Sequence, residues 1–118
     1  MNPVWKSFKD ALRGLRTVVR EERNFKIEIG AAVLASAAMI AARVSYAEAA
    51  LLVVAMSMVI AAEIVNTVIE DLCDKIEPDI DPAIGKIKDM MAAFVLVSSL
   101  GALAIGAIVF LHHVRLFT

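Results

Sequence analysis

The sequence AAEIVNTVIEDLCDKIEPDIDPAIGKIKDMMAAF, residues 61–94, connects two long apolar segments through a region rich in charge. Four polar side chains precede the turn at intervals of three or four residues: Glu63, Asn66, Glu70 and Asp74. At about 100° per residue of helix, they fall within an arc of about 80° and form one stripe. An acidic side chain at mid-membrane costs roughly 2.5–3.5 kcal/mol on insertion scales, so such groups face protein or water and usually serve a function. The stripe therefore predicts a functional site near one end of a membrane-spanning helix.

The composition of the whole chain is that of a membrane protein. Of its 118 residues, 60% are apolar, compared with roughly 45–50% in a soluble globular domain. Residues 90–111 carry no charge and can cross about 30 Å of hydrocarbon at roughly 1.5 Å per residue. We predict a single all-α membrane domain with spans at about residues 24–42, 46–70 and 88–112. The short connection RVSYAE, residues 43–48, makes the first two spans an antiparallel hairpin.

The amino-terminal segment, about residues 3–22, is predicted to be an amphipathic helix on the membrane surface. Its apolar side chains have helical spacing: Trp5, Phe8, Leu12, Leu15 and Val19. Basic side chains follow the same rhythm one residue later: Lys6, Lys9, Arg13, Arg16 and Arg20. Adjoining apolar and basic stripes suit a helix that lies among anionic lipid head groups. Either the segment is only an anchor and topology signal, or some of its cations also hold substrate phosphates.

The distribution of basic residues predicts the orientation. Seven of the twelve Lys and Arg residues lie within residues 6–26 and three within residues 75–88, whereas Arg43 and Arg115 stand alone on the opposite side. By the positive-inside rule, the amino terminus faces the cytoplasm and the carboxyl terminus faces away from it. The expected location is a bacterial-type inner membrane, and no nucleic-acid partner is expected.

The stripe offers the groups that phosphoryl transfer needs. Mg²⁺ prefers one or two carboxylates together with phosphate oxygens and water, and Glu70 is its natural ligand on this face. Three further carboxylates are candidates to complete the shell: Glu22, Glu28 or Asp74. Lys88, across the turn, would neutralise phosphate charge, and Glu63, deeper in the membrane, would accept a proton from a lipid hydroxyl.

Two other interpretations stay open at this point. The chain has neither GxxxxGK[ST] nor GxGxxG, so a kinase would need an architecture unrelated to the usual nucleotide-binding folds. The polar residues would otherwise form a seam that locks the helices of a non-catalytic scaffold together. A small proton or ion carrier would also use carboxylates within a membrane.

Three smaller features receive structural interpretations. The single Cys73 is expected to be a packing residue. Ala102 and Gly106 form a small-xxx-small pair that lets another helix approach closely. His112 and His113 lie at the far interface, and we predict no metal binding there.

Three segments resemble a known family: ERNFKIE (22–28), EIVNTVIEDLCDKI (63–76) and GKIKDMMAA (85–93). The pattern E-x-x-N-[ST]-x-I-E-x-x-x-D, followed by K-D at the start of the third span, is similar to the prokaryotic diacylglycerol kinase and undecaprenol kinase family. The resemblance covers the chain from Phe8 onward. It implies a homotrimer with a surface helix and three spans per chain, and active sites between subunits. It also implies transfer of the γ-phosphate of MgATP to diacylglycerol or undecaprenol, with ERNF and NT leaning slightly towards undecaprenol.

By position, the resemblance implies that Glu63 is the catalytic base and that Glu22 and Glu70 bind Mg²⁺. It implies a set of residues around the nucleotide: Asp10, Glu22, Glu70, Asp74, Asp79, Asp81, Lys88 and Asp89. Near the substrate or the reaction centre it places Glu28, Asn66 and Ala92. The chain departs from the family where Asp10 replaces a common aromatic residue, and where Asp79-Ile80-Asp81 replaces Glu-x-His. Contacts to the base and ribose would therefore differ.

Overall fold

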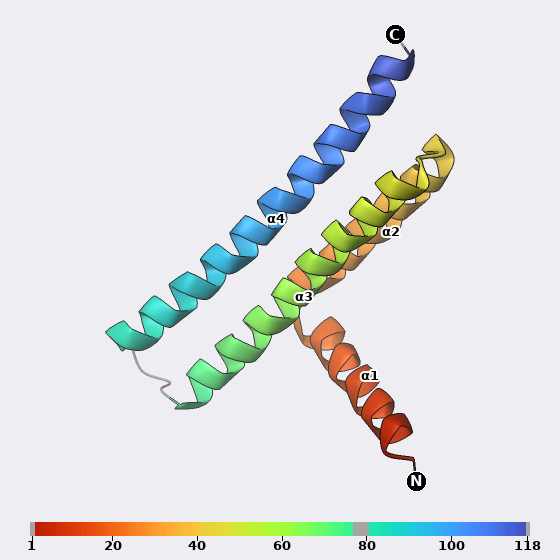
Figure 1. Ribbon diagram of the computed structural model, residues 1–118. Helices are drawn as coiled ribbons and strands as arrows, with labels where there is room; N and C mark the ends of the chain where they lie inside the picture. Colours follow the sequence, from red (N-terminus) through yellow and green to blue (C-terminus); the bar gives the residue numbers. More distant parts are fainter. Residues whose placement is uncertain (1, 77–80, 118) are drawn as a thin grey trace.

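The computed structural model describes the backbone of residues 2–76 and 81–117 and the side chains of residues 2–76 and 81–113. Within these residues it contains four helices: α1 Pro3–Glu21, α2 Arg23–Ala42, α3 Tyr46–Ile76 and α4 Pro82–Phe117 (Figure 1). The prediction of an all-α chain is confirmed. Asp79, one of the residues predicted around the nucleotide, lies outside the described residues.

Helices α2, α3 and α4 are each long and apolar enough to cross a membrane. Helix α3 has 31 residues and α4 has 36. At about 1.5 Å per residue they measure roughly 46 and 54 Å, which exceeds the ~30 Å of a hydrocarbon core. Both helices continue beyond the spans predicted from the sequence. The polar stripe therefore lies on uninterrupted helix.

Side-chain caps fix where α1 and α3 begin. Asn2 precedes α1, and its Oδ1 accepts a hydrogen bond from Val4 N at 2.9 Å. Ser45 precedes α3 and forms a reciprocal capping box with Glu48. Glu48 N donates to Ser45 Oγ at 3.1 Å, and Ser45 N donates to Glu48 Oε1 at 3.0 Å. Both caps satisfy backbone N–H groups that have no partner within the helix.

The backbone leaves helical geometry at Glu22 and at Arg43. Glu22 is extended, with φ −109° and ψ 111°, and separates α1 from α2. Arg43 ends α2 in the left-handed region, with φ 54° and ψ 49°, and its N–H donates to Ile40 O at 3.2 Å. Glycine usually occupies such a position because a Cβ atom is unfavourable there. Arg43 thus turns the chain from α2 into α3 at a conformational cost.

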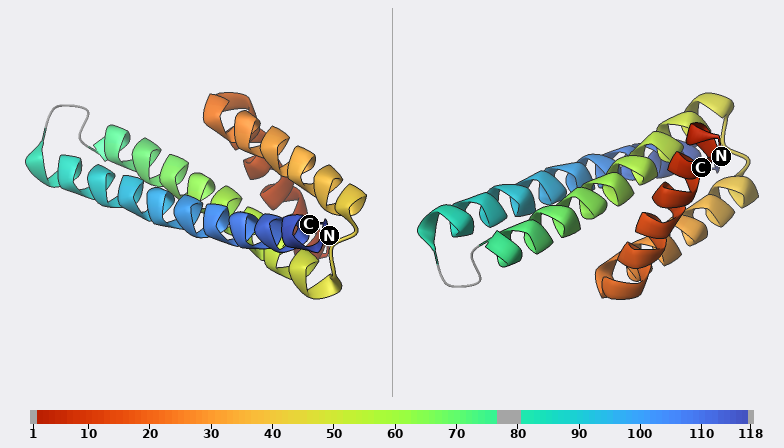
Figure 2. Two further views of the ribbon diagram at one scale, coloured as in Figure 1. Left: turned by 90° about the horizontal axis from the view of Figure 1, so that it is seen from above. Right: turned by 90° about the horizontal axis from the view of Figure 1, so that it is seen from below.

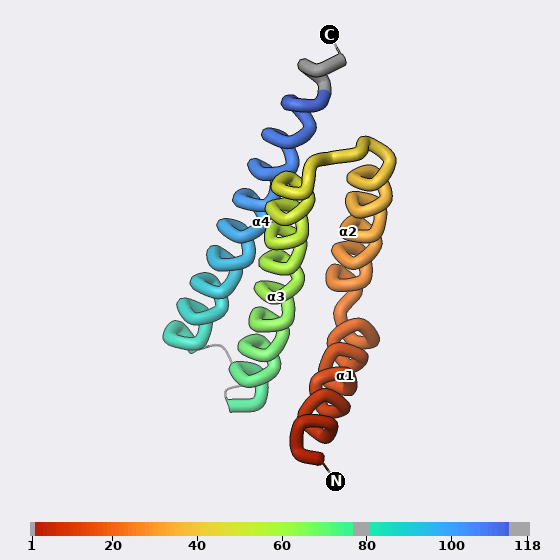
Figure 3. Tube along the Cα trace, turned by 45° about the vertical axis from the view of Figure 1, so that its right-hand side comes forward, coloured from red at the N-terminus to blue at the C-terminus, as the bar shows by residue number. Residues whose placement is uncertain are grey.

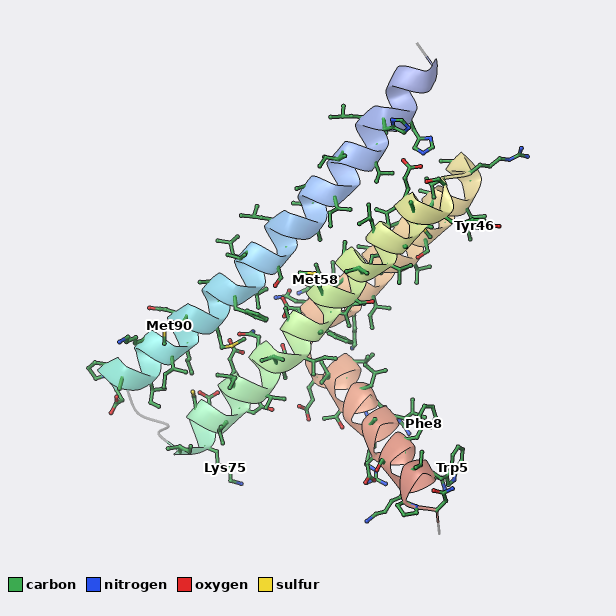
Figure 4. The ribbon with its side chains drawn as sticks, viewed as in Figure 1. Trp5, Phe8, Tyr46, Met58, Lys75 and Met90 are labelled. Carbon is green, nitrogen blue, oxygen red and sulfur yellow. The ribbon has the colours of Figure 1, made fainter. Side chains whose placement is uncertain are left out.

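Helix α3 lies between α2 and α4 (Figure 3). Helix α1 leaves this group at Glu22, and its free end lies well away from the start of α4 (Figures 1 and 2). In Figure 4, Lys75 and Met90 mark one end of the α3–α4 pair and Tyr46 marks the other. These are called the Ile76 end and the Tyr46 end below.

Few apolar side chains are buried within the chain: Val18, Phe25, Ala55, Ala62, Cys73 and Val109. Phe25, close to the break between α1 and α2, is fully buried. Cys73 has the packing position predicted for it. Many large apolar side chains of α2, α3 and α4 are exposed instead, an arrangement that suits a surface covered by lipid or by further chains.

Candidate functional site

Glu28 on α2 and Glu63 on α3 bring two carboxyl groups close together. Both residues are half-buried. Glu28 Oε2 is buried and has no hydrogen-bond partner among the described side chains. Two carboxylates at close range repel each other unless a donated hydrogen bond or a cation lies between them. These residues, called the carboxyl pair below, lie close enough for a side-chain hydrogen bond between them.

Asn66 lies one helical turn from Glu63 on the same face of α3, and it is half-buried. Thr67, the next residue, is buried, and its hydroxyl donates to the backbone oxygen of Glu63 at 2.9 Å. The Thr67 hydroxyl is thus already committed to its own helix. The Asn66 side chain, in contrast, has no such bond within the helix among the described residues, so it could form a hydrogen bond to a ligand beside the carboxyl pair.

An ion pair joins α3 to α4 at the Ile76 end. Lys88 Nζ lies 2.6 Å from Asp74 Oδ1, and the two side chains are 38% and 65% exposed. Glu70, one turn before Asp74, is exposed and close enough to act electrostatically on the Lys88 ammonium. The resemblance predicts all three residues around the nucleotide, and the structure brings them together. Because they are open to solvent, a phosphate group can reach Lys88.

Among the described side chains, the two glutamates predicted to bind Mg²⁺ have no ion-pair or hydrogen-bond partner. Glu22 lies in the extended link between α1 and α2 and makes no capping hydrogen bond. Neither Glu22 nor Glu70 takes part in an ion pair among the described side chains. Within the described part of the chain, no three His, Cys, Asp or Glu side chains converge on a metal position. Joint binding of Mg²⁺ by Glu22 and Glu70 therefore stays a prediction, in which phosphate oxygens and water would complete the shell of the ion.

Of the other predicted nucleotide residues that the structure describes, Asp10 and Asp81 have partners on their own helices, whereas Asp89 follows Lys88 of the Asp74–Lys88 ion pair. Asp10 pairs with Arg13 on its own helix, with Oδ1 3.4 Å from Nη1. Asp81 caps α4, and its Oδ1 accepts from Ala83 N at 2.8 Å. Asp89 is exposed beside Lys88 in the sequence. Ala92, predicted near the substrate, is exposed one turn further along α4.

An apolar groove extends from Glu28, the member of the carboxyl pair that lines it. Helices α2, α3 and α4 line it, and its volume is about 630 Å³. Its lining consists of Ala, Gly, Leu, Ile, Val, Met and Phe side chains, with Glu28 and Ser99 as polar members. A ligand in this groove would therefore be mostly apolar, with its polar part near Glu28.

A contact at the Tyr46 end was not predicted from the sequence. His113 Nε2 on α4 lies 3.1 Å from Glu48 Oε1 on α3, and the side chains are 16% and 18% exposed. The motif S-x-x-E at Ser45 signals the helix cap. The local pattern around Glu48 gives no indication that its side chain contacts His113, 65 residues later in the sequence.

Comparison with models of protein families matches residues 9–110 to the family described as prokaryotic diacylglycerol kinase. The matched range includes the carboxyl pair, the Asp74–Lys88 ion pair and the groove. A comparison with curated proteins gave no match.

Proposed function

We propose, because this chain belongs to the prokaryotic diacylglycerol kinase family, that it transfers the γ-phosphate of MgATP to the hydroxyl of a membrane lipid. The acceptor is diacylglycerol, giving phosphatidic acid, or undecaprenol, giving undecaprenyl phosphate. The observation that carries the proposal is the position of Glu63, which is half-buried and lies close to Glu28, and Glu28 in turn lines one end of the apolar groove. A lipid hydroxyl there meets a proton acceptor and an apolar surface at once.

In the proposed step, the Glu63 carboxylate accepts the hydroxyl proton while the hydroxyl oxygen forms a bond to the γ-phosphorus. The bond from that phosphorus to the bridging oxygen breaks, and ADP leaves with the electron pair. General-base assistance of this kind contributes about 10²- to 10⁴-fold. Glu28 and Asn66 flank the reaction centre and would orient the hydroxyl by hydrogen bonds.

The phosphate side of the reaction is assigned to the Ile76 end. Lys88 would exchange part of its contact with Asp74 for the phosphates, since both side chains are exposed. Glu22 and Glu70 would hold Mg²⁺, which neutralises phosphate charge and orients the nucleotide when bound. Asp74 and Asp89 would contact the nucleotide, and the departures at Asp10, Asp79 and Asp81 would change its base and ribose contacts.

The proposed orientation places the Ile76 end in the cytoplasm, where ATP is available, and the carboxyl terminus on the other side. The concentration of basic residues in positions 6–26 supports this assignment. Trp5 and Phe8 on α1 are half-exposed and stacked, with centroids 6.0 Å apart, and Lys9 Nζ lies 5.5 Å from the Trp5 ring. Exposed aromatic rings beside a cation suit a helix on the surface of an inner membrane.

A homotrimer is proposed to complete the site. Asp10 has its ion-pair partner on its own helix, and the free end of α1 lies away from the start of α4 (Figure 2). In an active site shared between subunits, a second chain would supply the residues that α1 does not reach within its own chain. The exposed apolar side chains of α3 and α4 offer surface for such contacts.

The test is phosphate transfer from γ-labelled ATP in detergent micelles with Mg²⁺, offering diacylglycerol and undecaprenol in parallel. The full chain should label one of these lipids. Glu63→Gln removes the proton acceptor while keeping the size of the side chain, so the turnover number should fall about 10³-fold. Nucleotide binding, measured by fluorescence of an ATP analogue, should stay close to the unmodified level.

Asp71→Asn is the matched control, because Asp71 is an exposed carboxylate on the same helix but off the polar stripe. It should keep full activity. Undiminished turnover in Glu63→Gln would contradict the base assignment. Absence of labelled lipid from folded protein with either acceptor would contradict the kinase function itself.

A further inference from the structure

A hollow on the surface of α1 is lined mainly by arginine side chains. Arg13, Arg16 and Arg20 recur at helical spacing, within an arc of about 60° and roughly 10 Å of helix length. Together with Thr17 and Glu21 they enclose a volume of about 340 Å³. These five residues, called the arginine hollow below, belong neither to the apolar groove nor to the ion pair at the Ile76 end. The proposed phosphoryl transfer uses none of them.

The guanidinium groups of the arginine hollow are available to a ligand. Arg16 and Arg20 form no ion pair among the described side chains. Arg13 lies 3.4 Å from Asp10, but both side chains are more than half exposed, and an exposed pair of this kind is weak enough to exchange partners. The Thr17 hydroxyl already donates to Arg13 O at 3.0 Å. Hydrogen bonds to a ligand would therefore come from the guanidinium groups.

The two halves of α1 carry different cations. Lys6 and Lys9 lie in the first two turns, whereas every basic residue from position 13 to the end of α1 is an arginine. A lysine ammonium acts as a point charge, but a guanidinium is a planar fork that can bind two oxygens of one phosphate. The arginine hollow is therefore suited to a phosphate group, and the lysine half to negative charge in general.

The charge balance of the hollow indicates which kind of phosphate it fits. Three guanidinium groups and the carboxylate of Glu21 leave its lining with two net positive charges. A phosphate monoester carries about −1.5 to −2 charge at pH 7 and offers three acceptor oxygens. A phosphate diester, the group in most membrane phospholipids, carries a single negative charge and offers two free oxygens. The monoester matches the hollow better in both respects.

The place of the hollow on α1 favours a lipid as the carrier of this phosphate. Trp5, Phe8 and Leu12, on the adjoining apolar stripe, are each at least half exposed within the chain. Trp5 and Phe8 lie towards the free end of α1 (Figure 4). With this stripe in the membrane surface, the neighbouring arginines reach the level of the lipid head groups. A soluble phosphate compound would leave the apolar stripe without a partner.

We propose that Arg13, Arg16 and Arg20 bind the phosphate monoester of an anionic membrane lipid. Phosphatidic acid and undecaprenyl phosphate, the two alternative products of the proposed reaction, both belong to this class. Only this link to the product rests on the proposed kinase function, since the site itself is argued from α1 alone. A chain that makes such a lipid would then also bind it at a second place, away from the carboxyl pair.

The test measures binding of phosphatidic acid to the full chain in nanodiscs of neutral phosphatidylcholine, without nucleotide. Trp5 is the single tryptophan of the chain and lies on the same helix as the hollow. Energy transfer from Trp5 to phosphatidic acid with a dansyl group on its acyl chain therefore reports binding. Unlabelled phosphatidic acid should displace the labelled lipid at a concentration at least about tenfold lower than phosphatidylglycerol, a diester, requires.

The decisive variant replaces Arg13, Arg16 and Arg20 together by lysine. It keeps the charge but removes the forks, so the preference for phosphatidic acid over phosphatidylglycerol should fall to within about twofold. All three positions are exposed, and helix content measured by circular dichroism should stay unchanged. Arg23→Lys is the matched control, because Arg23 is an exposed arginine at the start of α2 that does not line the hollow. It should keep the full preference.

Two outcomes would overturn the lipid site. Equal binding of the two lipids by the unmodified chain, or an unchanged preference in the triple variant, would mean that α1 responds only to negative charge at the membrane surface. Displacement of the labelled lipid by ATP at the concentrations at which phosphatidic acid acts would assign the hollow to the nucleotide instead.

The lipid site and the kinase function fail separately in these measurements. Binding is measured without ATP, so loss of the preference would contradict the lipid site and leave the kinase function standing. A chain that binds phosphatidic acid selectively but labels neither lipid with γ-phosphate would support the site and contradict the kinase function.

Discussion

Among the described side chains, each end of the α3–α4 pair carries one contact between ionisable groups of the two helices, and the two contacts differ in solvent access. At the Ile76 end, Asp74 and Lys88 meet at 2.6 Å with 65% and 38% of their side chains exposed. At the Tyr46 end, Glu48 and His113 meet at 3.1 Å with less than a fifth exposed. An exposed ion pair adds little stability because water and salt screen it. The first pair is therefore free to exchange partners with a ligand.

The residues around the two pairs also differ: an unpaired carboxylate lies near the exposed pair, whereas a helix cap adjoins the shielded pair. Lys88 has Glu70 nearby, and Glu70 has no ion-pair partner of its own among the described residues. Glu48 instead also caps α3 through Ser45. A hydrogen-bonded cap and a shielded pair both hold helices in register. We therefore expect the exposed pair at the Ile76 end to be available for binding and the shielded pair at the Tyr46 end to stabilise the fold.

The largest expected effect at the Ile76 end is that of Lys88→Met. This substitution keeps a long apolar stem but removes the ammonium that would neutralise phosphate charge, so kcat/KM for ATP should fall about 10²-fold. The thermal midpoint in detergent should barely move, since the ion pair that is lost is exposed. Steady-state kinetics and differential scanning fluorimetry measure the two quantities on the same preparation.

Lys86→Met is the control, because Lys86 is an exposed cation on the same helix that forms no ion pair among the described side chains. It should leave kcat/KM within about twofold. Equal losses in the two variants would mean that only the general positive potential matters. Unaltered kinetics in Lys88→Met would contradict the expected role of the Asp74–Lys88 pair in binding ATP.

A smaller effect is expected for Ser45→Ala at the Tyr46 end, where stability and not activity should change. Loss of the side-chain cap of α3 should destabilise the protein by about 1 kcal/mol, seen as a lower thermal midpoint. The turnover number and both KM values should stay unchanged. Ser57→Ala, at an exposed serine within the same helix, should alter neither quantity. A loss of activity in Ser45→Ala without a loss of stability would give the Tyr46 end a role in function.

The comparison also shows how far the sequence predicts this molecule. Periodicity predicted the stripe on α3, and length with composition predicted the three long apolar helices. The Asp81-Pro82 start of α4 could have been recognised as a cap, since Asp at the N-cap followed by Pro is a known helix start. The family resemblance assigned Asp81 to the nucleotide instead.

Contacts between helices could not be predicted from the sequence in the same way. The closeness of Glu28 to Glu63 depends on the register of α2 against α3, and that of His113 to Glu48 on the register of α4. A single helix pattern specifies which face is polar, but the register is set by packing over the whole helix pair. The boundary between the amino-terminal helix and the first span was predicted at about residues 22–24, and the backbone leaves helical geometry at Glu22 although neither glycine nor proline stands there.

The smallest expected effect concerns Arg43, at the Tyr46 end, where the backbone itself is unfavourable. Arg43 has φ 54°, a left-handed conformation that costs a residue with a Cβ atom roughly 1–2 kcal/mol. Glycine avoids this cost but loses more entropy on folding, so Arg43→Gly should stabilise the protein by about 0.5–1 kcal/mol. Arg43→Ala removes the same charge without relieving the backbone and should give no gain. Equal shifts of the thermal midpoint in the two variants would trace the effect to the lost charge. A gain confined to Arg43→Gly would show that the connection between α2 and α3 at the Tyr46 end holds Arg43 in a strained backbone conformation.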